Sequence, residues 1–430
     1  MQTKLLFLAF CYPPFNSVAT YRNIKISKFL AKNNFQQYVF CAEVKDNNDD
    51  AINNDIPNNA KIFRKKATFL LSKNSKAISP KKSLMHSFIC SMKELFFSPE
   101  RHIWWVLPFL PKMIKIIREE NIKFVMVEGS PYSSLVGGYF LKKICGIRLI
   151  LDFHDPWTTY SINQKQGFIR KKINQFWERK CVQSADLITY CSDSVYKDLA
   201  NLYGQDFSAM SLPNGFDLDD FKDLFDSNIP LQSGGAGWLK NADSQTNNKI
   251  FLYAGKYFIN SPDYNPILVI KSFIDFTEKY SCKDCNLVLV GYTDQATINT
   301  IDRLNCKHVK CLNIMPRKDV FMMCSQADVL IHFRYPMPSK NTIALKLCEY
   351  AIFNKPIINF NAMEGDMYDF IKDNELGEST VNDDIDKMRE LLYKAYQGEI
   401  NICHNPLEKL ERYNYDVSVK RLADKIMELG

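Results

Sequence analysis

The sequence has no long hydrophobic run, although 46% of its 430 residues are apolar. A helix that spans a membrane needs about 20 apolar residues, whereas the best candidate, residues 103–111, is far shorter and contains two prolines. The first residues, MQTKLLFLAFCYPPF, superficially resemble a signal peptide, but their apolar run is short and no small-residue cleavage site follows. We therefore interpret this segment as a buried strand and expect a cytoplasmic protein.

A disulfide framework is missing as well. The thirteen cysteines are an odd number and are scattered, which is typical of reduced thiols in a cytosol. Five potential zinc ligands lie close in sequence, namely Cys282, Cys285, Cys306, His308 and Cys311. The last two cysteines lack the tight spacing of a second ligand pair. Because the sequence also has no P-loop, no Gly-x-Gly-x-x-Gly and no Asp-x-Asp after an apolar strand, we predict neither a metal site nor a cofactor.

Positive charge is concentrated in one region. The formal net charge is +7, and the segment between Lys61 and Lys123 holds 14 Lys or Arg and 4 Glu, so that +10 falls there and −3 on the rest. This asymmetry indicates an anionic partner. The cations alternate with long aliphatic residues and the Trp104–Trp105 pair, which favours a membrane surface over nucleic acid. The alternative is that the apolar residues pack into a core and the lysines are solvated.

Strand and helix patterns alternate through both halves of the chain. Residues 4–10 form a continuous apolar run, a helix to about Lys32 follows, and residues 36–43 read as a second strand. Residues 249–254 restart the alternation. A chain of this length exceeds one usual core. The sequence therefore predicts two doubly wound, Rossmann-like α/β domains, in which ligands bind at the carboxyl ends of parallel strands.

In the first half, polar residues follow three predicted strands. Tyr12, Pro13 and Pro14 come after the first strand, and Arg22 lies on the next helix. The strand at residues 148–152 leads into Phe153-His154-Asp155-Pro156-Trp157, and a third strand ends in Pro-Asn-Gly-Phe-Asp, which contains Asn214. His154 at the rim of the sheet is a candidate for proton transfer or for a hydrogen bond to a sugar, and Asp155 can orient it or an acceptor hydroxyl.

In the second half, the rim of the sheet carries Gly255 and Lys256 after one strand, Tyr292 after the next, and Arg334 after a third. A glycine admits a close ligand, and the cations suit a diphosphate. The segment NTIALKLCEY, residues 341–350, is predicted to be a helix capped by Ser339, Asn341 or Thr342. Its free N-terminus would attract a phosphate, and Lys346 and Glu349 would lie three residues apart on one edge.

The ordered motifs at residues 12–22, 152–157, 213–217, 255–256 and 341–349 resemble those of GT-B glycosyltransferases, in particular the family-4-like retaining enzymes. In that family an acidic residue, seven intervening residues and a Glu hold the donor sugar and the ribose. Glu349 matches the second acid, whereas Asn341 stands in the place of the first. The family's glycine-rich turn is also absent, since Asn16, Ser17 and Val18 occupy it.

The resemblance implies two domains that face each other across a cleft. It implies an acceptor-binding and membrane-facing domain over residues 1–225, a linker or lid at 226–248, a nucleotide-sugar-binding domain at 249–412 and a terminal helix at 413–430 that crosses back. Its donor site would comprise Gly255, Lys256, Tyr292, Arg334, Asn341, Thr342, Lys346 and Glu349. Its acceptor site would comprise Tyr12, Arg22 and Asn214, with His154 and Asp155 as catalytic residues.

The function expected from the resemblance is a metal-independent hexosyltransferase-type glycosyltransferase. It would move a sugar from a nucleotide-diphosphate sugar to a glycan or lipid-linked acceptor with retention, in surface polysaccharide synthesis on the inner face of the cell membrane, and it would bind no nucleic acid. Three alternatives remain: an inverting enzyme with His154 or Asp155 as base, a sugar-nucleotide epimerase, and a degenerate protein that only binds.

Overall fold

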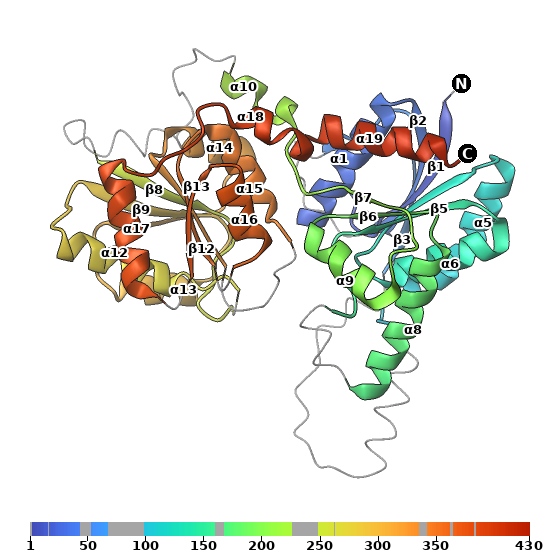
Figure 1. The fold of residues 1–430 in the computed structure, drawn as a ribbon, viewed down its shortest axis with the longest axis horizontal. Coiled ribbons are helices and arrows are strands. Elements are labelled where there is room, and N and C mark those ends of the chain that lie inside the picture. The colour runs from blue at the N-terminus through green and yellow to red at the C-terminus, as the bar shows by residue number, and fades with distance from the viewer. Residues whose placement is uncertain are drawn as a thin grey trace, which may run out of the picture. The chain divides into compact units, whose positions relative to one another are not determined.

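The computed structural model describes residues 2–15, 17–43, 53–67, 99–159, 167–225, 248–261, 263–334, 342–361, 364–381 and 384–430. The chain divides into two compact units (Figure 1). Unit 1 consists of residues 1–214 and 415–430, and unit 2 of residues 215–414. The first unit therefore ends at Asn214, before the boundary at residue 225 that the sequence suggested. Each unit is described by itself below.

Unit 1 is built on a seven-stranded parallel sheet in the order β3-β2-β1-β4-β5-β6-β7. Its strands are β1 (Thr3–Leu8), β2 (Phe35–Glu43), β3 (Lys61–Lys66), β4 (Phe124–Glu128), β5 (Arg148–Phe153), β6 (Leu187–Tyr190) and β7 (Ala209–Ser211). The central strands are apolar on both faces, because helices cover both sides of a parallel sheet. The signal-like start is strand β1, as predicted.

The helices of unit 1 connect these strands. They are α1 (Val18–Lys32), α4 (Ile103–Val106), the 3₁₀ turn η2 (Leu107–Phe109), α5 (Leu110–Glu119), α6 (Ser133–Cys145), α8 (Phe168–Ser184), α9 (Asp193–Tyr203) and α19 (Tyr415–Glu428). The terminal helix α19 packs against α1 and so belongs to the same unit as the first strand (Figure 1).

Unit 2 is built on a six-stranded parallel sheet in the order β10-β9-β8-β11-β12-β13. Its strands are β8 (Lys249–Ala254), β9 (Cys285–Val290), β10 (Val309–Leu312), β11 (Val329–Arg334), β12 (Ile357–Asn361) and β13 (Gly377–Val381). Apolar clusters lie on the two faces of this sheet. The predicted pair of doubly wound parallel α/β units is therefore confirmed.

The helices of unit 2 follow the same alternation. They are η3 (Leu218–Phe221), α10 (Lys222–Phe225), α12 (Ile267–Lys279), α13 (Gln295–Asp302), α14 (Arg317–Gln326), α15 (Leu345–Tyr350), η4 (Ala351–Phe353), α16 (Asp366–Asp373), α17 (Ile385–Gln397), α18 (Pro406–Lys409) and η5 (Glu411–Tyr413). The two places where the chain passes between the units lie side by side, because Phe216 pairs with Asn414 in a parallel bridge.

The structure describes part of the basic region that runs from Lys61 to Lys123. Lys61 to Lys66 form the edge strand β3, and the Trp105 side chain is a core residue rather than a surface one. The Trp105 indole N–H donates to the Lys65 carbonyl at 2.9 Å and its ring meets Phe10 edge-on, so it cannot enter a membrane. Residues 68–98 of this region lie outside the described part of the chain. Among the described helices, none is long and apolar enough to cross a membrane.

Candidate functional site

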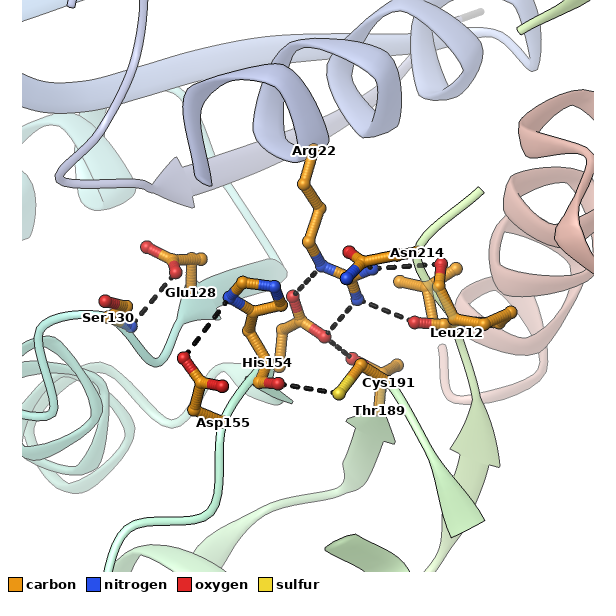
Figure 2. A network of polar contacts seen from close by, with 11 residues as sticks. Arg22, Glu128, Ser130, His154, Asp155, Thr189, Cys191, Leu212 and Asn214 are labelled. Carbon is orange, nitrogen blue, oxygen red and sulfur yellow. Dashed lines mark hydrogen bonds and ion pairs between the residues drawn. The ribbon is translucent and has the colours of Figure 1, made fainter. Parts of the chain in front are cut away.

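A buried ion pair between Arg22 on α1 and Asp152 on β5 forms the centre of the polar network of unit 1 (Figure 2). Arg22 Nη2 lies 2.9 Å from Asp152 Oδ1 and Nε lies 3.1 Å from Oδ2, a two-pronged contact with both side chains fully buried. The guanidinium also donates to the carbonyls of Leu212 and Pro213 at 2.7 and 3.0 Å. Thr189 donates to Asp152 at 2.7 Å. The network therefore ties α1 to β5, β6 and the segment after β7.

The structure places Arg22 and Tyr12, the two residues that the resemblance assigns to the acceptor, inside unit 1. Arg22 has no exposed surface, and every contact above goes to its own unit, so it supports the rim of the sheet from inside. Tyr12 is fully buried and shares a hydrogen bond of 2.8 Å with Ser27, which in turn donates to Gln37. Neither side chain can touch a substrate without a rearrangement of the core.

His154 and Asp155 lie at the carboxyl end of β5, next to this ion pair (Figure 2). His154 Nδ1 is 3.7 Å from Asp155 Oδ2, and no hydrogen-bond partner meets that buried nitrogen. Burial lowers the pKa of His154 against the opposing effect of Asp155, and the nearby Arg22 lowers it further. His154 is therefore neutral at neutral pH, with Asn214 within hydrogen-bonding reach. The structure brings His154, Asp155 and Asn214 together.

Glu128, the last residue of β4, is a site residue that the sequence analysis missed. Its side chain is fully buried, and one carboxyl oxygen accepts a hydrogen bond of 3.0 Å from the Ser130 N–H (Figure 2). Burial, followed by the neighbouring Asp152 carboxylate, raises the pKa of Glu128 well above its usual range and so favours its protonated form. The sequence could have pointed to Glu128, because it is the last residue of a predicted strand and ligands bind at the carboxyl ends of parallel strands.

In unit 2, Lys346 lies under the turn that ends β8. Its Nζ donates to the Tyr253 hydroxyl at 2.8 Å and sits 4.0 Å from the centre of that ring. A Cβ on Gly255, which has φ +148°, would lie 2.5 Å from the same nitrogen. Burial, followed by the positive charges of Arg334 and Lys256, lowers the pKa of Lys346 to about 7. The predicted cations therefore lie near one another at the end of β8 and β11.

Glu349 forms an ion pair with Arg317, which the sequence analysis did not predict. Arg317, the first residue of α14, donates to Glu349 Oε1 at 2.6 Å and to Asp220 Oδ2 at 3.3 Å. The Arg317 guanidinium also lies 4.8 Å from the centre of the Phe321 ring. Glu349 and Lys346 lie three residues apart on α15, and the hydrogen bonds described here join Glu349 to Arg317 and Lys346 to Tyr253.

The predicted helix N-terminus is wrong in position. Helix α15 begins at Leu345 with Ala344 as its N-cap and no side-chain cap, and it is six residues long. The buried Thr342 precedes the helix outside any regular secondary structure, so the helix N-terminus expected near Thr342 is not found there. Asn341 and Ser339 lie outside the described residues. Tyr292 is 62% exposed at the end of β9 and meets Phe258 edge-on.

The five candidate zinc ligands do not form a metal group. In the described part of the chain, Cys282, Cys285, Cys306, His308 and Cys311 do not bring any three ligand atoms within 4.8 Å of one another. His308 Nδ1 instead lies 3.1 Å from the Cys285 carbonyl oxygen.

Comparisons with known proteins agree with this geometry. Residues 23–220 match the model of a family described as Glycosyltransferase Family 4. The structure is similar to sucrose-phosphate synthase from Thermosynechococcus elongatus, with TM-score 0.63 and 13% identity over 100% of this chain and 99% of that chain. It is also similar to Anabaena HepE in complex with UDP-glucose (TM-score 0.61, 15% identity, 100% of both chains). A glycosyltransferase from Rickettsia africae gives TM-score 0.66 at 12% identity over 100% of both chains. A comparison with curated protein sequences finds no match.

The structural similarities, at 12–15% identity, define the fold, which is GT-B. The match to the Glycosyltransferase Family 4 model, over residues 23–220, supports the resemblance that the sequence motifs indicated.

Proposed function

We propose that the chain transfers a hexose from a nucleotide-diphosphate sugar to a glycan or lipid-linked acceptor. The observation that carries the proposal is the group of cations around Gly255. Lys256, Arg334 and Lys346 are close enough that two of them depress the pKa of the third. Such a group is costly to the folded protein unless an anion offsets its repulsion, and a diphosphate has the matching charge.

Each residue of unit 2 then has a role in donor binding. Lys256, Arg334 and Lys346 neutralise the diphosphate as the sugar leaves, a role that a metal ion fills in other transferases. Glu349, held by Arg317, accepts hydrogen bonds from the ribose hydroxyls. The exposed ring of Tyr292 stacks on the base, and the lack of a Cβ at Gly255 lets the Lys346 ammonium lie close to the end of β8. UDP-glucose bound to the similar HepE supports a nucleotide sugar as the ligand.

The acceptor binds near His154, Asp155 and Asn214 of unit 1. The similarity to family-4 enzymes favours retention of the anomeric configuration. We place the reaction in surface polysaccharide synthesis at the inner face of the cell membrane, with residues 61–123 toward anionic lipid. Charge reversal at Lys65, Lys66, Lys81 and Lys82 is expected to weaken binding to anionic vesicles, and unchanged binding would contradict this orientation.

One observation favours an inverting reaction as a second candidate. The neutral His154 carries a buried nitrogen without a hydrogen-bond partner, beside Asp155, and an inverting enzyme needs a general base of this kind. The anomeric configuration of the product, read by NMR, decides between the two.

The first test is ligand-induced thermal stabilisation. A panel of nucleoside diphosphates is added in the presence of EDTA to the wild type, to Glu349→Ala and to the control Glu378→Ala, whose carboxylate makes an exposed pair with Lys394. One base is expected to raise Tm in the wild type and the control but not in Glu349→Ala, because a ligand stabilises only a chain that binds it. Absence of a shift with every nucleotide would contradict the donor site and favour a protein that only binds other partners.

A further inference from the structure

Helix α8 carries a surface that the sugar-transfer site does not use. Of the twelve large hydrophobic side chains that are exposed among the described residues, three lie on this helix. Phe168 is 76% exposed, Phe176 54% and Ile169 47%. Single exposed apolar residues are ordinary, whereas several on one helix face indicate a contact surface.

The three apolar residues share one face with cations. Each residue of an α-helix is rotated by about 100° from the one before it. Ile169 therefore lies about 100° from Phe168 around the helix axis and Phe176 about 80° from it, so the three side chains fall within an arc of about 100°. The exposed Lys172, Arg179 and Lys180 lie on the same arc or at its margin, and the exposed Lys171 lies beyond it. Lys172 Nζ sits 5.7 Å from the centre of the Phe168 ring, and Lys180 Nζ sits 5.8 Å from that of Phe176.

The only acidic residue of α8, Glu178, is on the opposite side. It is 1% exposed, and it accepts hydrogen bonds from Tyr203 at 2.7 Å and from the Thr158 hydroxyl. Burial raises its pKa. The exposed face therefore presents three cations and no acid. We name it the α8 face, and it consists of Phe168, Ile169, Lys172, Phe176, Arg179 and Lys180.

The helix is held firmly enough to present this face. The Trp177 ring packs edge-on against Tyr139 and Phe140 of α6, with centroids 6.0 and 5.7 Å apart. Cys181 and Val182 belong to the core of unit 1. In Figure 1 the first turns of α8 extend past the end of the sheet and beyond the other described helices of this unit.

We propose that the α8 face binds the surface of an anionic lipid bilayer. The two phenylalanines and Ile169 would enter the boundary between headgroups and acyl chains, while the lysines and Arg179 contact lipid phosphates. Cationic side chains beside aromatic and aliphatic ones on a single helix face are the pattern of an interfacial helix. An aliphatic residue gains little from a nucleic acid, whose exposed features are phosphates and stacking faces. The surface lies outside residues 61–123 and is independent of donor binding.

The test measures co-sedimentation of the full chain with vesicles. Wild type is mixed with vesicles of phosphatidylcholine alone or with added phosphatidylglycerol, at low and high salt. The test variants are Phe168→Ser with Phe176→Ser, and Lys172→Glu with Lys180→Glu. The matched controls are Leu202→Ser, an exposed leucine 39% accessible on α9, and Lys387→Glu, whose side chain is 70% exposed in unit 2. Thermal unfolding and nucleotide-induced stabilisation check that all variants keep their fold and donor site.

Both α8 variants are expected to lose at least tenfold in binding to the anionic vesicles, while both controls bind like the wild type. Wild-type binding should fall at high salt and on neutral vesicles, because the lysines contribute through lipid charge. Full binding by both α8 variants would overturn the proposal. It would also be overturned if wild type bound neutral and anionic vesicles equally, or if a single-stranded oligonucleotide bound to the α8 face and the vesicles did not.

Discussion

Arg317 holds the carboxylate of Glu349 at a distance of 2.6 Å and holds Asp220 at 3.3 Å. The three side chains are mostly buried, and the guanidinium packs over the Phe321 ring. A charge-assisted hydrogen bond in such a place fixes the direction of the carboxylate. In the proposed donor site, Arg317 is therefore the residue that positions Glu349.

Substitution of Arg317 by Ala should therefore weaken nucleotide binding. Loss of a hydrogen bond to a charged group costs about 1.5–3 kcal/mol, which corresponds to a dissociation constant at least about tenfold higher. Titration calorimetry with the nucleotide that stabilises the wild type measures it. Lys394→Ala, which breaks only the exposed pair with Glu378, serves as the control and should leave the affinity unchanged. Tighter binding in Arg317→Ala would mean that Arg317 competes with the nucleotide for Glu349.

The lowered pKa of Lys346 predicts a pH dependence of donor binding. Because this pKa is about 7, Lys346 loses its charge as the pH rises through neutrality, whereas an ordinary lysine keeps it. A nucleotide sugar has no phosphate group that titrates in this range. Its affinity should fall between pH 6 and pH 8, and binding should take up a proton, which calorimetry in two buffers of different ionisation enthalpy detects.

The variant Lys346→Arg checks the assignment, since arginine stays protonated at every pH used. It should bind the donor with little pH dependence. An affinity of wild type that is constant from pH 6 to pH 8 would show that Lys346 is already charged or does not contact the diphosphate.

The alternation of apolar runs and helical segments was enough to predict two parallel α/β units. Strands such as β1 and β8 are apolar on both faces and can be read without knowledge of their neighbours. The candidate residues at the strand ends followed from the same rule, since His154 comes directly after β5 and Lys256 lies two residues after the end of β8. The residues that follow the predicted strands therefore located the carboxyl-end rim of each sheet.

Side-chain partners could not be read in this way. The separation of Arg22 from Asp152 is 130 residues, and that of Lys346 from Tyr253 is 93, so only the fold brings them together. The resemblance assigned Arg22 to the acceptor, whereas its side chain is fully buried in unit 1. The start of α15 was misplaced because several polar residues before it are competent caps, whereas the helix begins only after Ala344, whose side chain cannot cap it.

The close approach of two glycines at the donor rim predicts a selective defect. Gly291 has φ +140°, and a Cβ there would collide with the Gly255 carbonyl oxygen. Gly291→Ala should therefore displace the ends of β8 and β9, lower the thermal stability of unit 2 and abolish nucleotide-induced stabilisation. Gly146 is the matched control, because it also has positive φ, +67°, but no atom lies within 4 Å of its Cβ position. Gly146→Ala should cost only about 1 kcal/mol, and equal effects of the two substitutions on nucleotide binding would contradict the close-approach argument.

The ion pair between Arg22 and Asp152 predicts a large loss of stability when one partner is removed. Asp152→Ala leaves a guanidinium without its carboxylate in a site with no exposed surface, which costs about 3–5 kcal/mol. Urea unfolding followed by tryptophan fluorescence measures this cost, because Trp104, Trp105, Trp157 and Trp177, four of the five tryptophans, belong to unit 1. The surface pair between Lys115 and Glu119 in the same unit is the control, with side chains 70% and 59% exposed.

Removing one partner of that exposed pair, as in Glu119→Ala, should cost less than about 0.5 kcal/mol, because solvent screens such pairs. A similar small loss in Asp152→Ala would contradict a structural role for the buried pair. In that case Arg22 would tolerate the absence of its partner, and a direct role for Arg22 in acceptor binding would need to be considered again. The expected order, a loss several times larger for Asp152→Ala than for Glu119→Ala, would instead establish that Arg22 supports His154 and Asn214 from within unit 1.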